Sequence, residues 1–180
     1  MEKRCGLMGE YGTGAKSGLV AGLVYGIMSG IIAVIGLSLA KTEIIATLNK
    51  YIANYPTLVS AGITANSLYS IIIIIAPVGS VIVGLIGGAI LGLIFAWAVG
   101  KLPGRNDKVK GIVFGMILWI LFDVLFGLGS IGEYGALYYV VDIAGGFVGA
   151  IAFGYVIGIL YGKWALQPIN DDIIGPGMAN

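Results

Sequence analysis

The sequence predicts an all-α integral membrane protein, a bundle of four transmembrane helices with an amphipathic outer helix between the first two. Three observations support this fold class: the composition, four long apolar stretches, and glycine at four-residue intervals. Hydrophobic residues make up 58% of the 180 residues and charged residues 11%, whereas soluble domains contain roughly 25% charged residues. A soluble fold of this size could not bury so much apolar surface in one core. We therefore expect residues 1–180 to form a single transmembrane domain.

The four apolar stretches lie at about 18–40, 77–99, 110–129 and 137–162. A helix needs roughly 20 apolar residues to cross a bilayer, and each stretch meets that length. The second stretch follows a run of isoleucines at 71–75. Because Pro77 cannot donate a backbone hydrogen bond, we expect the span to begin there, with the isoleucines forming a bent extension. Residues 164–180 form a polar tail.

An amphipathic segment at about 42–55 separates the first two spans. Its apolar residues recur on one helical face and include Ile44, Leu48, Tyr51, Ile52 and Tyr55. Pro56 marks the end of the helix. Two positions fit this pattern, one on the membrane surface and one capping the bundle.

Lysine and arginine are distributed unevenly between the two sides of the predicted bundle. The N-terminal segment, the connection between spans two and three, and the end of span four carry most of them, while the other side carries only Lys41 and Lys50. Basic residues concentrate on the cytoplasmic side of membrane proteins. We expect a multi-pass protein of the cell membrane with both termini in the cytoplasm.

Glycine accounts for 31 residues, and within the spans it recurs every fourth position. The rows predicted to pack helices are Gly18, Gly22, Gly26 and Gly30; Gly84, Gly88 and Gly92; and Gly154, Gly158 and Gly162. Spacing of four keeps these positions on one helical face. Each glycine costs a helix about 1 kcal/mol relative to alanine, so the regular order indicates close helix packing, which in lipid depends on small residues.

The glycine rows also suggest an internal duplication. Gly18 and Gly22 follow a lysine as Gly111 and Gly115 do, and the row of span two recurs in span four at a constant offset. Two parallel helical hairpins would follow, an arrangement that occurs in transporters. Glycine periodicity alone can imitate such a repeat.

Asp123 lies inside the third apolar stretch. An aspartate at the centre of a membrane helix costs about 2.5–3.5 kcal/mol, so such a residue invites a functional explanation. Apart from Lys110 at the first position of the third stretch, no Lys, Arg or His lies within the spans to neutralise it. When residues are counted from the lysine at the start of each span, Ser29 lies at the same depth in the membrane as Asp123. Two interpretations stay open: a proton or small-cation site formed with Ser29, or a neutral aspartate that bonds Ser29 or a backbone carbonyl.

Asp142 is the second acid within an apolar stretch. If its helix begins at Ile143, Asp142 is the N-cap and lies at the outer interface, above Asp123. Counted from the outer loop, however, the two acids are similarly deep. We favour the capping interpretation and keep a second acid of the site as the alternative.

Several classes of protein are excluded by what the sequence lacks. It has no histidine, no P-loop and no nucleophile elbow, and its single Cys5 rules out an intramolecular disulfide. We therefore expect no enzyme, no cofactor and no metal site. The net charge of +1 gives no basic surface for nucleic acid.

Two functions remain. The first is transport or conduction of a proton or small cation by a glycine-packed bundle. The second is a non-catalytic structural or assembly subunit of a larger membrane complex. In both, the expected partners are the lipid bilayer and either further copies of the chain or other membrane subunits.

Overall fold

The computed structural model describes residues 2–126 and 136–165, and the structured elements within them are all helices. The all-α class is therefore confirmed for this part of the chain. The elements are α1 (Glu2–Leu39), α2 (Lys41–Ala53), α3 (Pro56–Ser60), α4 (Ala65–Ala98), α5 (Asp107–Trp119), the π-helix η1 (Ile120–Phe126) and α7 (Ala136–Ala165).

Three helical segments are long and apolar enough to cross a membrane: Gly9–Leu39, Ala65–Ala98 and Tyr138–Ala165. They indicate a membrane-embedded protein that crosses the bilayer several times. The predicted third span, 110–129, differs from the others because its α-helix ends at Trp119 and continues as η1. Its last residues, 127–129, lie outside the described part of the chain.

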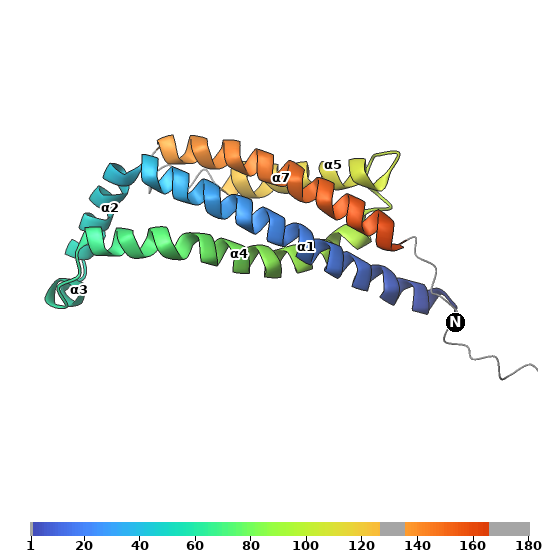
Figure 1. Cartoon of the computed structure of the whole chain (residues 1–180), viewed down its shortest axis with the longest axis horizontal. Coiled ribbons are helices and arrows are strands. Elements are labelled where there is room, and N and C mark those ends of the chain that lie inside the picture. Colours follow the sequence, from blue (N-terminus) through green and yellow to red (C-terminus); the bar gives the residue numbers. More distant parts are fainter. Residues whose placement is uncertain (1, 127–135, 166–180) are drawn as a thin grey trace, which may run out of the picture.

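The three long helices and α5 pack side by side in the order α4, α1, α7, α5 (Figure 1). α1 packs along both α4 and α7, and α5 packs along α7. The two outer members of this series, α4 and α5, meet through Phe95 and Phe114, whose ring centroids are 5.3 Å apart. Figure 1 shows α2 and α3 at one end of the molecule and the N-terminus at the other.

Glycine backbones bring α1 and α4 into direct contact. A Cβ atom on Gly18 would lie 2.6 Å from the Cα atom of Gly92, and one on Gly22 would lie 2.7 Å from that of Gly88. Further along the pair, Gly26 meets the backbone of Ser80 and Val81, and Gly30 meets Pro77. No side chain fits between backbones at this separation. Dispersion contact at such short range is what holds helices together in lipid.

The same kind of contact joins α5 to α7. A Cβ atom on Gly111 would lie 2.9 Å from the Cα atom of Gly158 and would collide with the carbonyl oxygen of Gly154. One turn later, Gly115 packs against Ala150. At the end of α7, Gly162 lies beside the carboxylate of Asp107.

α4 begins at Ala65, well before the predicted start of the span at Pro77. A capping box starts the helix: Thr64 Oγ1 accepts from the Ser67 backbone N–H at 3.2 Å, and Ser67 Oγ accepts from the Thr64 backbone N–H at 3.1 Å. This motif satisfies two free backbone donors. The isoleucine run is therefore helical, and Pro77 lies inside a continuous helix.

α2 covers the end of the α1–α4 pair. Ile44 is buried in a cluster with Leu37, Ala40 and Tyr69, and Ile52 is also buried. The apolar face of α2 thus packs on the protein, which favours the capping position over a helix that lies only on the membrane surface. Tyr51 and Tyr55, also predicted on this face, are exposed and stack with each other.

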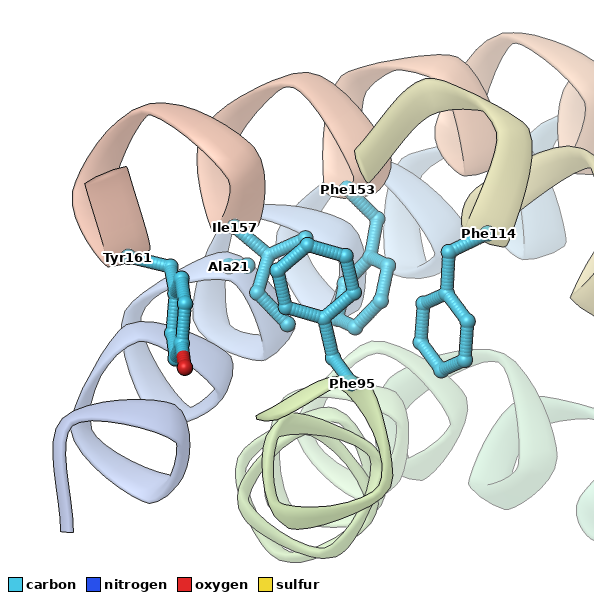
Figure 2. Packing of buried hydrophobic residues seen from close by; sticks show 6 residues of the cluster. All are labelled: Ala21, Phe95, Phe114, Phe153, Ile157 and Tyr161. Carbon is cyan, nitrogen blue, oxygen red and sulfur yellow. The ribbon is translucent and has the colours of Figure 1, made fainter. Parts of the chain in front are cut away.

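A core cluster near the other end joins all four long segments (Figure 2). Its buried members are Ala21, Phe95, Phe114, Phe153, Ile157 and Tyr161. Phe95 is fully buried and packs against the ring of Tyr161, edge to face, at 5.4 Å. The cluster fixes α4 relative to α5 at this end of the bundle.

Candidate functional site

Asp123 lies in η1, a π-helix that follows α5 directly. π-helical turns are rare and occur frequently at functional sites. The segment is held against α7 by Trp119, whose Nε1 donates to the carbonyl oxygen of Ile143 at 3.1 Å. The indole ring also packs edge to face on Phe147, with centroids 5.2 Å apart. These contacts fix the side of η1 that carries Asp123.

Two glycines of α7 make room for side chains that reach in from neighbouring helices. A Cβ atom on Gly146 would collide with Oδ1 of Asp123. A Cβ atom on Gly149 would lie 3.0 Å from Cε2 of Tyr25, a residue of α1. The glycines here therefore admit side chains of neighbouring helices, whereas the glycine rows admit a neighbouring backbone.

Asp142 is not an N-cap. α7 begins at Ala136, so Asp142 lies inside the helix, and the capping interpretation is wrong. The apolar residues at 136–141 continue the helix toward its N-terminus, which places its first turn well before Asp142. Asp142 is half-buried and lies on the same helix as Gly146.

The two acids share one small cavity. It has a volume of about 10 Å³ and is lined by Tyr25, Ser29, Ile32, Asp123, Asp142, Gly145, Gly146 and Gly149. Asp123 and Asp142 are close enough to interact electrostatically, and both interact with Tyr25. The expected difference in depth between the acids is therefore wrong. The cavity brings together two carboxyl and two hydroxyl groups from three helical segments, and its size is near the minimum for one water molecule.

A larger cleft adjoins this cavity and shares Tyr25, Ser29 and Asp123 with it. Its volume is about 440 Å³, and it lies between α4 and the α5–η1 segment, with α1 and α7 behind. Apart from Ser80, its other lining residues are glycines and apolar side chains. The cleft exists because α4 and α5, the two outer helices of the series, pack together only near Phe95 and Phe114.

Among the described residues, no basic side chain lines either the small cavity or the cleft. In residues 2–126 and 136–165, no group of three or more His, Cys, Asp or Glu residues is arranged to hold a metal ion. Two carboxyl groups in apolar surroundings repel each other when both are ionised. A bound proton or a single small cation would relieve that repulsion.

A family model described as a family of unknown function, DUF6789, matches residues 8–171. The chain belongs to the DUF6789 family. The DUF6789 match includes both acids and every residue of the small cavity. No curated protein and no solved structure matches the chain. Membership of the DUF6789 family therefore assigns no activity, and the site has to be interpreted from its own chemistry.

The structure brings Asp123 and Ser29 together, as predicted from their depth, and adds Asp142 to them. Tyr25 is the residue that sequence analysis missed. A signal was available, because Tyr25 precedes Ser29 by four residues and therefore lies on the same face of its helix. Nothing in the sequence indicated that Gly146 and Gly149 pack against Asp123 and Tyr25. A glycine row indicates that another group packs closely on the helix, but it does not show which group.

Proposed function

We propose that this protein transports or conducts a proton or small cation across the membrane, with Asp123 and Asp142 as the binding site. One observation carries the proposal: two intramembrane acids on different helices meet at one cavity with Tyr25 and Ser29. Acidic residues within membrane segments commonly mark ion pathways and proton relays. The hydroxyl groups supply hydrogen-bond partners that suit either a water molecule or a desolvated cation.

We propose that the chain crosses the membrane four times. Three crossings are the long apolar helices, and α5 and η1 together form the fourth. The chain is helical from Asp107 to Phe126, roughly 20 residues, which is the length that a crossing requires. This segment lies along α7 from Gly111 to Asp123. With the basic connections on one side, the positive-inside rule places both termini in the cytoplasm of a multi-pass cell-membrane protein.

The packing supports two parallel hairpin repeats in a modified register. Gly111 packs against Gly154 and Gly158. At the constant offset between spans two and four, Gly154 corresponds to Gly92 and Gly158 corresponds to Ala96. In the first hairpin the residue that meets Gly92 and Ala96 is Gly14. Gly111 therefore corresponds to Gly14, one turn earlier than the alignment on Gly18 that the lysines suggest.

Flux through proteoliposomes tests the function. The parent protein should carry pH- or cation-dependent flux when a gradient is imposed, and Asp123→Asn should reduce it to the level of protein-free vesicles. Glu43→Gln is the matched control, because Glu43 is an exposed acid of α2 that lines neither cavity. The proposal fails if the parent shows no flux or if Asp123→Asn conducts like the parent.

A second candidate function is a non-catalytic subunit of a membrane assembly, formed with further copies or with other proteins. It is favoured by Gly79 and Gly87 of α4, because a Cβ atom added at either would meet no described atom within 4 Å. Bare backbone of this kind can receive another helix. Native mass determination in mild detergent decides between the two: stoichiometric foreign subunits support the assembly role, and a monomer contradicts it.

A further inference from the structure

The cleft beside the acid pair is much larger than a proton or a small cation requires. Its volume of about 440 Å³ falls within the range of small-molecule sites, roughly 300–1,000 Å³. A Cβ atom added at Gly87, which lines the cleft, would meet no atom within 4 Å. Within the described residues, the space directly beside Gly87 is therefore open.

The lining of the cleft selects the charge of a ligand. Asp123 contributes a carboxyl group, and no basic side chain is present among the described residues of the lining, so an anion would be repelled. The aromatic rings of Tyr25, Trp119 and Phe122 belong to the same lining. Faces of aromatic rings attract organic cations, most strongly where water is excluded. A neutral ligand would gain nothing from the carboxyl group of Asp123, whereas a cation could pair with its ionised form.

The cleft borders the lipid-facing surface. Val83, one of its lining residues on α4, is 70% exposed, and Phe122 on the opposite wall is also exposed. A ligand that partitions into the bilayer could therefore enter between α4 and η1 without crossing the core cluster at Phe95.

We propose that the cleft binds a lipophilic organic cation, with its charge paired to Asp123 and its apolar groups against α4. This inference rests on the proposed function, because it names a further substrate class for the same acidic site. Small cations and protons use the small cavity between the acids, whereas the organic cation occupies the adjoining cleft.

Equilibrium dialysis of the full chain in mild detergent with tetraphenylphosphonium tests the inference. We expect saturable binding, and we expect Gly87→Leu to weaken it at least about tenfold by filling the cleft. Gly79→Leu is the matched control, since it makes the same change on the same helix at an open glycine outside the cleft. Its affinity should stay within about twofold of the parent.

The charge requirement is tested separately. Asp123→Asn should weaken tetraphenylphosphonium binding at least about tenfold, and uncharged triphenylphosphine oxide should bind the parent correspondingly less well. The inference is overturned if the parent shows no saturable binding, if the neutral compound binds equally, or if Gly87→Leu binds like the parent. A changed native mass of Gly87→Leu would also overturn it, because the cleft would then be a contact for another helix.

Flux measurements keep this inference separate from the proposed function. Gly87→Leu should retain proton or small-cation flux while it loses tetraphenylphosphonium binding, because the acid pair is untouched. If Gly87→Leu does not reconstitute, Val83→Trp fills the cleft from an exposed position on the same helix. Intact flux without tetraphenylphosphonium binding overturns the further inference alone, and binding without flux in the parent overturns the proposed function alone.

Discussion

Gly87 and Gly88 are neighbours on α4, and replacing each with alanine should have different effects on stability. A Cβ atom at Gly88 would lie 2.6 Å from the Cα atom of Gly22 and 3.0 Å from its backbone nitrogen. Carbon atoms pack best at about 3.5–4.0 Å, so α1 and α4 would have to separate by roughly 1 Å. A Cβ atom at Gly87 would meet nothing within 4 Å.

The two substitutions make the same chemical change on the same helix, and they differ in the collision with the α1 backbone at Gly88. Both gain about 1 kcal/mol of helix propensity, because alanine is the better helix former. Overpacking at a rigid contact costs about 1–3 kcal/mol, and the obstacle at Gly88 is backbone that cannot rotate away. The free energy of unfolding of Gly88→Ala should therefore be about 1–3 kcal/mol lower than that of Gly87→Ala.

Reversible unfolding in mixed detergent micelles, followed by far-ultraviolet circular dichroism, measures this difference. Gly87→Ala should be more stable than the parent, and Gly88→Ala should be at most as stable as the parent. If the two variants unfold at the same detergent fraction, α1 and α4 do not meet through their glycine backbones, and the packing described here is refuted.

Three further predictions concern single side chains. Gly146→Ala places a methyl group where Oδ1 of Asp123 lies, so flux in proteoliposomes should fall while helix content, measured by circular dichroism, stays constant. Trp119→Phe removes the 3.1 Å bond to Ile143; the free energy of unfolding should fall by about 1 kcal/mol, and an unchanged value would contradict that contact. Tyr69→Phe removes the buried hydroxyl that donates to Leu37 O at 3.1 Å, with a comparable loss of about 1 kcal/mol in the same unfolding measurement.

Much of the helical organisation could be predicted because lipid imposes a simple requirement on sequence. A span has to be apolar over a fixed length, so residues 18–40 and 137–162 were visible as continuous stretches. The first lies within α1 except for Ala40, and the second lies within α7. The start of α4 was not visible, because Pro77 suggested a boundary while the capping box that starts the helix lies earlier, at Thr64 and Ser67.

The candidate site was predicted only in part because depth can be counted along a helix but rotation cannot. Counting residues placed Ser29 level with Asp123, and the structure has both at one cavity. Counting residues gave the wrong depth for Asp142. The count depends on where α7 begins, and the local sequence favoured a start at Ile143. Convergence of Tyr25 and Asp142 on Asp123 depends on how three helices rotate against one another, which residue spacing within one helix does not determine.

Infrared titration of the carboxyl bands tests most directly whether Asp123 and Asp142 form one site. If they share a cavity, the parent releases their protons in two coupled steps that belong to the pair. Asp142→Asn should then leave a single step for Asp123 at a pH different from both. A titration of Asp123 that is identical with and without the Asp142 carboxyl group would show two independent acids and contradict the account.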